Sequence, residues 1–92
     1  MAKVVMYTTS YCPYCMRAKR LLQHKGAPFE EIDVGGDDAL RDKMAAESGR
    51  RSVPQILING RAIGGFDELH TLDQRGELDV LLAEDSPPVN QS

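Results

Sequence analysis

Residues 3–16, Lys-Val-Val-Met-Tyr-Thr-Thr-Ser-Tyr-Cys-Pro-Tyr-Cys-Met, decide the fold of this chain. The first six residues form a short apolar and β-branched run, which is typical of a buried strand. Two cysteines follow, separated by two residues, and the sequence has no others. Pro13 fits the first turn of a helix, where its missing N–H costs no hydrogen bond. The stretch therefore predicts a strand that leads through Cys12 into a helix that carries Cys15.

The rest of the chain supplies partners for this strand and helix. Glycine ends the first helix at Gly26 and also marks the later boundaries. The further elements are a strand at 28–34, a helix from Asp37 or Asp38 to Gly49, an Asn59-Gly60 hairpin between strands at 55–58 and 62–63, and a helical stretch from Asp67 through Leu82 that is interrupted near Gly76. Together they predict an α/β fold in the order β-α-β-α-β-β-α, in which helices flank a four-stranded mixed sheet.

The length and composition indicate one small soluble domain. A chain of 92 residues supports a single core. We assign residues 1–84 to the domain and residues 85–92, which have little to bury, to a flexible C-terminal tail. Hydrophobic residues make up 41% of the chain, and no apolar run reaches the roughly eighteen residues of a membrane helix. The N-terminus also lacks the apolar centre of a signal peptide, so we expect a cytoplasmic protein with no membrane partner.

The charge balance limits the classes of partner. The chain has 11 Lys and Arg against 14 Asp and Glu, a formal net charge of −3, which does not favour a nucleic-acid surface. Local basic clusters at 17–20 and 50–51 still leave room for small anionic ligands. We expect no nucleic-acid partner, and we expect the chain to be a monomer.

Two structural explanations of the cysteine pair are disfavoured. A disulfide between Cys12 and Cys15 closes a loop too short to constrain the unfolded chain much, and cytosolic disulfides are usually catalytic. A structural zinc site needs four ligands, and a second Cys-x-x-Cys is absent from the sequence. His24 lies about 13 Å along the helix from Cys15, out of reach of a shared metal. We assign no role to His24 or His70, and we expect no metal site.

A redox pair explains the pattern better. Cys12 precedes the first turn of a helix, so backbone N–H groups and the positive end of the helix dipole favour its thiolate. Cys15 lies one turn inside the helix and is expected to be more buried and protonated. Cys12 is therefore the predicted nucleophile that forms a mixed disulfide, and Cys15 is the resolving thiol that displaces the substrate. A Cys-x-x-Cys between a strand and a helix of a βαβ unit is a strong signal for this chemistry.

With these residues in place, the sequence resembles the glutaredoxin family. Cys12-Pro13-Tyr14-Cys15 is the active-site sequence typical of dithiol, class I glutaredoxins, and the likeness runs from Val4 to about Leu82. Three further motifs follow in the family's order and approximate spacing: Ser52-Val53-Pro54-Gln55, the Asn59-Gly60 hairpin and Gly64-Gly65-Phe66-Asp67. The resemblance implies a thioredoxin-like fold.

The resemblance also implies a glutathione-binding site near the cysteines. Tyr14 would flank the reactive sulfur. Ser52, Val53 and Pro54 would form a loop opposite the cysteines, with a cis bond before Pro54 and the Val53 backbone free for strand-like pairing with a bound peptide. An X–Pro bond reaches the cis form at a cost of only about 0.5–1 kcal/mol.

The corner after the hairpin would hold the γ-glutamyl end of glutathione. Glycine permits close approach there, and free N–H groups at the start of a helix favour an anion. The resemblance implies that the carboxylate binds backbone N–H groups around Gly65, Phe66 and Asp67, and that the ammonium lies near the Asp67 carboxylate. Arg41 matches a position where the family often directs a polar or basic residue toward the glycine carboxylate, with a solvated helix arginine as the alternative.

Two positions depart from the pattern of many relatives. Thr9 stands where they carry a lysine three residues before the nucleophile, which removes a positive charge from the expected site. Phe66 stands where they often have a small polar residue that can cap the helix, and its ring has no capping group. We expect Arg51 to replace part of the missing charge.

The residues and the resemblance together predict a glutathione-dependent thiol-disulfide oxidoreductase. It would reduce protein disulfides with both cysteines and protein-glutathione mixed disulfides with Cys12 alone, with glutathione as co-substrate and no bound cofactor. Its partners would be glutathione and disulfide-containing or glutathionylated proteins. Two alternatives stay open: a thioredoxin-like reductant regenerated by a flavoprotein reductase, and a carrier of a [2Fe–2S] cluster held between two monomers. Pro13 disfavours the second, because cluster-binding relatives more often have a small residue there.

Overall fold

The computed structural model describes residues 2–84, so the predicted tail at 85–92 lies outside the described residues. In chain order the elements are β1 (Val4–Thr8), α1 (Pro13–His24), β2 (Glu30–Asp33), α2 (Asp38–Ser48), β3 (Gln55–Ile58), β4 (Arg61–Gly64), α3 (Phe66–Gln74) and α4 (Glu77–Ala83). The predicted order is confirmed. The last predicted helix is two helices, because Gly76 takes a left-handed φ of 73° at the start of α4.

The four strands form one mixed sheet in the order β2-β1-β3-β4. The central strand β1 pairs in parallel with β2, across the α1 connection, and antiparallel with β3. β3 pairs antiparallel with β4, and the connecting residues Asn59 and Gly60 have positive φ angles of 53° and 82°. Such angles are what a two-residue hairpin turn requires. The predicted hairpin and mixed sheet are confirmed, and β4 is an edge strand.

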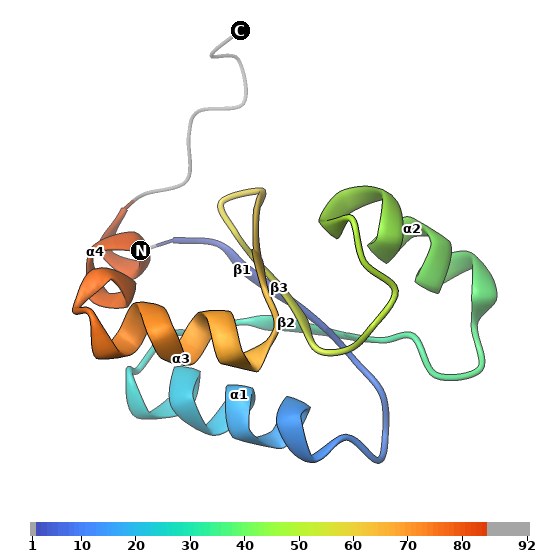
Figure 1. The fold of residues 1–92 in the computed structure, drawn as a ribbon, viewed down its shortest axis with the longest axis horizontal. Helices are drawn as coiled ribbons and strands as arrows, with labels where there is room; N and C mark the ends of the chain where they lie inside the picture. Colours follow the sequence, from blue (N-terminus) through green and yellow to red (C-terminus); the bar gives the residue numbers. More distant parts are fainter. Residues whose placement is uncertain (1, 85–92) are drawn as a thin grey trace, which may run out of the picture.

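Helices cover both faces of the sheet (Figure 1), with α1 and α3 on one side and α2 on the other. Alternate residues of β1 point to opposite faces, so each face has its own core. The core on the α1 and α3 side includes Val4, Met6, Ala18, Leu22, Ile56, Ile58, Leu69 and Leu78. The core under α2 is made of Tyr7, Val34, Met44 and Leu57. β1 is therefore held on both sides, which fixes the position of its C-terminal end.

Capping residues set the ends of α2 and the start of the loop that follows it. The Asp37 side chain accepts a hydrogen bond from the Leu40 N–H at 3.0 Å, and Gly49 ends the helix with a φ of 82°. Both positions were predicted. Residues 50–54 then run between α2 and β3 toward the end of β1 where the cysteines lie. Within residues 2–84, no helix is long and apolar enough to cross a membrane.

Candidate active site

Cys12 is the N-cap residue of α1. Its backbone is extended, with φ −131° and ψ 101°, and its sulfur accepts a hydrogen bond from the Cys15 N–H at 3.1 Å. The side chain is 8% exposed and is a free thiol. An N-cap side chain normally provides an oxygen for the free N–H groups of the first turn. Here the acceptor is the Cys12 sulfur, which therefore satisfies one of the free N–H groups at the start of α1.

Cys15 lies one turn further along α1 and is more deeply buried. It is 1% exposed, and its sulfur is also a free thiol. Burial, together with the neighbouring Cys12, raises the pKa of the Cys15 thiol well above its usual value. A protonated, buried thiol is a poor first nucleophile. Cys15 is therefore the more buried of the two cysteines and has a raised thiol pKa, as the sequence predicts, and the role of Cys12 as nucleophile stays a prediction.

The loop before β3 faces Cys12. The Val53–Pro54 peptide bond is cis, as the resemblance implies. The Cys12 sulfur lies 3.9 Å from the Val53 carbonyl oxygen, which is within the range of a weak thiol-carbonyl hydrogen bond. The loop therefore places the Val53 backbone directly beside the reactive sulfur.

A small pocket joins this loop to the start of α3. Its volume is about 170 Å³. Seven of the residues predicted for the glutathione site line it: Tyr14, Ser52, Val53, Pro54, Gly65, Phe66 and Asp67. Three residues that were not predicted also line it, namely Arg50, Gln55 and Glu68. The sequence-predicted residues of three separate segments thus meet around one cavity.

Aromatic rings form the wall of the site on the α1 side. The Tyr14 and Phe66 ring centroids are 6.4 Å apart, and Phe66 is 5.6 Å from the His70 ring. The Arg17 guanidinium lies 5.3 Å from the centroid of the Tyr14 ring, an arrangement typical of a cation–π contact. Tyr14 remains 53% exposed, so one part of the ring is open to a ligand. His70, to which we assigned no role, contacts Phe66.

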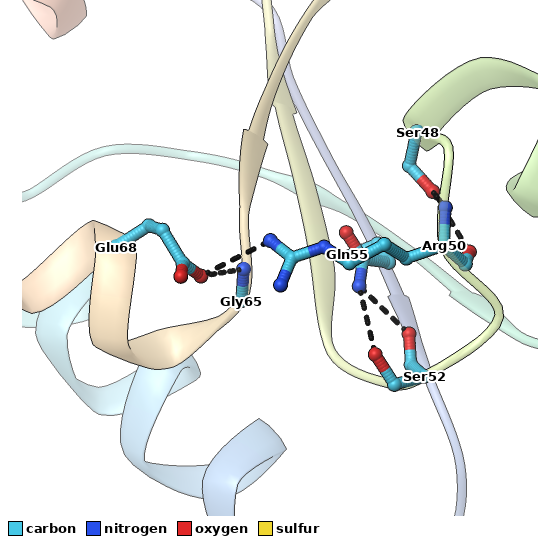
Figure 2. Close-up of polar contacts among 6 residues, drawn as sticks. All are labelled: Ser48, Arg50, Ser52, Gln55, Gly65 and Glu68. Carbon is cyan, nitrogen blue, oxygen red and sulfur yellow. Dashed lines mark hydrogen bonds and ion pairs between the residues drawn. The ribbon is translucent and has the colours of Figure 1, made fainter.

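Glu68 caps α3 in place of a side chain at Gly65. Its Oε1 accepts a hydrogen bond from the Gly65 N–H at 2.7 Å and lies 3.2 Å from Nη2 of Arg50 (Figure 2). The bond from Gly65, together with Arg50, lowers the pKa of the Glu68 carboxyl. Because Glu68 takes the Gly65 N–H, the N–H groups of Phe66 and Asp67 are the ones that the first turn leaves for a ligand. Phe66 therefore does not need to cap the helix.

The Gln55 side chain holds the cis-proline loop in place through hydrogen bonds to Ser52. Its side-chain Nε2 donates to the Ser52 carbonyl at 2.9 Å and to the Ser52 hydroxyl at 3.2 Å (Figure 2). The residue is 1% exposed, and its Oε1 has no partner within residues 2–84. A buried acceptor without a partner is costly unless a ligand or water fills the need. Gln55 thus holds the loop through its two contacts with Ser52.

The remaining basic residues are arranged differently from the prediction. Arg41 lies on α2 and is not among the residues that line the pocket, so its contact with a ligand stays a prediction. Arg51 pairs with Asp42 at 2.6 Å and does not line the pocket either. The expectation that Arg51 replaces the missing charge is wrong in this structure, because its neighbour Arg50 is the arginine that lies at the pocket.

Comparison with known proteins identifies the family. The family model for glutaredoxin matches residues 4–63, which include both cysteines and the cis-proline loop. The chain belongs to the glutaredoxin family. As a glutaredoxin it is a thiol-disulfide oxidoreductase with a thioredoxin-like fold, and Cys12-Pro13-Tyr14-Cys15 is consistent with the dithiol type.

Individual relatives extend the match over most of the chain. The protein is 52% identical to glutaredoxin 3 of Escherichia coli over 82 residues, 89% of this chain and 99% of that protein. It is 51% identical to a glutaredoxin of Pseudomonas aeruginosa over 90% of this chain and 99% of the other. Among solved structures, the glutaredoxin of Brucella melitensis has a TM-score of 0.79 at 49% identity, covering 89% of each chain. The buckwheat glutaredoxin-glutathione complex has a TM-score of 0.81 at 31% identity, covering 88% of this chain and 76% of the other.

Proposed function

We propose that this glutaredoxin uses glutathione as its co-substrate and reduces both protein-glutathione mixed disulfides and protein disulfides. The observation that carries the proposal is the position of Cys12. Its sulfur lies 3.9 Å from the carbonyl of Val53, which lines a pocket that continues to the helix start at Phe66 and Asp67. The similar buckwheat glutaredoxin forms a complex with glutathione, which supports the same ligand here.

In the single-cysteine route, Cys12 acts without Cys15. The Cys12 thiolate attacks the glutathione sulfur of a protein-glutathione disulfide, and the protein thiolate leaves and takes up a proton. A second glutathione thiolate then attacks the glutathione sulfur bound to Cys12. The products are glutathione disulfide and the Cys12 thiolate, so one free glutathione thiol is consumed and one protein thiol is released for each mixed disulfide reduced. The protein contributes orientation of the reacting sulfurs, since the pocket holds the glutathione portion in place.

In the two-cysteine route, Cys12 first attacks a protein disulfide and forms a mixed disulfide with the substrate. Cys15 then attacks the Cys12 sulfur, which releases the second substrate thiol and leaves a Cys12–Cys15 disulfide. Because the pKa of Cys15 is raised, its proton has to pass to the departing thiolate during this step. Two molecules of glutathione then reduce the enzyme disulfide.

We propose that the γ-glutamyl end of glutathione binds at the start of α3. Its γ-glutamyl carboxylate would bind the N–H groups of Phe66 and Asp67, where the helix dipole favours an anion. Its ammonium would lie beside the Asp67 carboxylate, which has no ion-pair partner within residues 2–84. Its backbone would pair with Val53. One copy of the chain suffices for this arrangement, and we propose that it works as a monomer in the cytoplasm, where a glutathione pool is available.

A covalent adduct provides the test. The Cys15→Ser variant is treated with glutathione disulfide, and the product is analysed by intact mass and peptide mapping. We expect one glutathionyl group on Cys12 that is removed by reduced glutathione, and we expect none on the matched Cys12→Ser variant. An adduct that forms equally well in Cys12→Ser, or no adduct at all in Cys15→Ser, would contradict the proposal.

A further inference from the structure

An apolar groove lies between the edge strand β4 and helix α3. It is next to the small pocket between the cis-proline loop and α3, which we call the thiol pocket because the Val53 carbonyl of its lining lies beside the Cys12 sulfur. The volume of the groove is about 420 Å³. The apolar part is formed by Ile63, Leu72 and Leu81, which are only partly buried although they pack on the core. Exposed Ala62 and Thr71 complete the two walls. Asp67 and Glu68, at one end of the groove, also line the thiol pocket. The other lining residues have no part in the chemistry of the cysteines.

The groove continues directly from the thiol pocket. Asp67 and Glu68 line both cavities, so the first turn of α3 is their common boundary. On the other side of this boundary, the Gly65 backbone lies close to the Pro54 carbonyl. Pro54 belongs to the loop that faces Cys12. From the corner at Gly65, β4 leads back to the hairpin, and α3 leaves the same corner in another direction toward α4 (Figure 1). A chain segment that leaves the reactive sulfur along this side of the molecule would enter the groove.

The far end of the groove carries an unused positive charge. Arg61 begins β4, is exposed and lines the groove. It has no ion-pair partner among residues 2–84, unlike Arg50, Arg51 and Arg75. Because β4 is the edge strand, its outer backbone groups also lack a partner strand. Apolar side chains, free backbone groups and a terminal charge are the features that bind an extended peptide segment.

We propose that this groove is a docking subsite for the protein substrates of the thiol site. Its occupant is an extended segment of the substrate that places an apolar side chain against Ile63 and Leu72 and an acidic side chain toward Arg61. This inference rests on the proposed function, because the segment is tethered to a sulfur held at Cys12. It adds a preference among protein substrates that glutathione recognition alone does not provide.

The test compares peptides that differ only in the docking residues. The probes are synthetic peptides with one S-glutathionylated cysteine and a Leu-x-Asp sequence at three to eight residues on either side of it. Matched peptides carry Ser-x-Asn at the same place, and the small substrate is the cysteine-glutathione mixed disulfide. For at least one position we expect kcat/KM to be about 3- to 30-fold higher for Leu-x-Asp than for Ser-x-Asn, as burial of one apolar side chain allows.

Exposed groove residues provide the variants. Ala62→Glu fills the groove and repels an acidic side chain, so it should remove the preference. Val80→Glu adds the same charge on α4, where Val80 is 63% exposed and does not line the groove, and should keep the preference. For the wild type, kcat/KM should be about 1.5- to 5-fold higher for Leu-x-Asp than for a matched Leu-x-Lys peptide. For Arg61→Glu, kcat/KM should be higher for Leu-x-Lys by a similar factor.

The small substrate separates the two levels of the proposal. Turnover of the cysteine-glutathione disulfide should be unchanged in Ala62→Glu, Arg61→Glu and Val80→Glu, because it does not reach the groove. If the wild type turns over the small substrate but shows no preference at any peptide position, the docking subsite is refuted and the proposed function stands. An equal loss of the Leu-x-Asp preference in Ala62→Glu and Val80→Glu would refute the docking subsite as well. Failure of the wild type with the small substrate would refute the proposed function itself.

Discussion

The Arg50 guanidinium lies 3.2 Å from the Glu68 carboxylate, and this ion pair connects the cis-proline loop with the start of α3. Glu68 in turn accepts the Gly65 N–H, and the Arg50 N–H donates to the Ser48 hydroxyl at the end of α2 (Figure 2). A Cβ at Gly64 would lie 2.6 Å from the Arg50 guanidinium, so glycine at this position makes room for the pair. The pair thereby sets the separation of the two halves of the pocket.

We predict that loss of this ion pair weakens ligand binding more than it slows the chemical step. Arg50→Ala should raise KM for the cysteine-glutathione disulfide about 1.5- to 5-fold at nearly constant kcat, as expected for an exposed pair. Arg50→Ala and Glu68→Ala should be non-additive in a double-mutant cycle. Arg75→Ala removes an exposed pair with Glu77 away from the pocket, and it should leave KM unchanged. A drop in kcat with constant KM would argue against the positioning role of Arg50.

Gln55 should contribute to stability through the loop that it holds. Gln55→Ala leaves the Ser52 carbonyl without its donor, and we expect it to lower the free energy of unfolding by about 1–3 kcal/mol. Ser52→Ala removes only the longer contact at 3.2 Å and keeps the carbonyl contact, so its effect should be smaller. Denaturant unfolding measures both. An equal decrease in the free energy of unfolding in the two variants would show that the contact with the Ser52 carbonyl is not the main stabilising contact.

The two cysteines should differ strongly in alkylation. Cys15 is 1% exposed and its thiol pKa is raised, whereas Cys12 accepts the hydrogen bond at the helix start. At pH 7 to 8 we expect iodoacetamide to modify Cys12 well before Cys15. Peptide mapping of samples taken over time measures the two rates. In Cys12→Ser the remaining thiol should stay unreactive until the protein unfolds. Comparable rates at the two positions would contradict the assignment of nucleophile and resolving thiol.

Tyr7 should make stability depend on pH in the alkaline range. Burial, followed by the hydrogen bond from its hydroxyl to Glu47, raises the pKa of Tyr7 to about 12. In the unfolded chain the phenol ionises near its usual pKa of about 10. The raised value means that the Tyr7 contribution is complete below pH 10 and is lost as the pH rises toward 12.

Tyr7→Phe tests this assignment. The variant should lose about 0.5–1.5 kcal/mol of stability at neutral pH and should show a smaller decline between pH 10 and 12 than the wild type. Tyr11→Phe removes a hydroxyl from a side chain that is 99% exposed and should behave like the wild type. An alkaline decline that is identical in wild type and Tyr7→Phe would show that another group causes it.

Local sequence signals determined most of the fold. The Asn59-Gly60 turn, the cap at Asp37 and the placement of Cys12 before Pro13 each depend on residues within a few positions, and each is confirmed. The division between α3 and α4 depends on Gly76, where the sequence already indicated an interruption. Such features could be predicted because backbone conformation there is set by the residue type itself.

Of the site residues that were missed, Arg50 depends on a contact between distant segments. Arg50 meets Glu68, 18 positions later, and nothing near Arg50 distinguishes it from Arg51, which turns to Asp42 instead. Glu68 had a local signal, because a glutamate three residues after an N-cap position is half of a capping box. Gln55 was predicted as a strand residue and as the last residue of the Ser52-Val53-Pro54-Gln55 motif, and its buried amide acquires its role through the loop geometry of Ser52. Tertiary packing, rather than local pattern, assigns Arg50 to the site, whereas Gln55 and Glu68 contact residues three positions away.

Turnover of the cysteine-glutathione disulfide tests the account most directly. The assay contains glutathione, glutathione reductase and NADPH, and it compares the wild type with Cys15→Ser and Cys12→Ser. We predict that the wild type and Cys15→Ser turn over and that Cys12→Ser is inactive. An inactive wild type that nevertheless reduces a protein disulfide when supplied with a flavoprotein thiol reductase would contradict the glutathione site at Val53, Phe66 and Asp67.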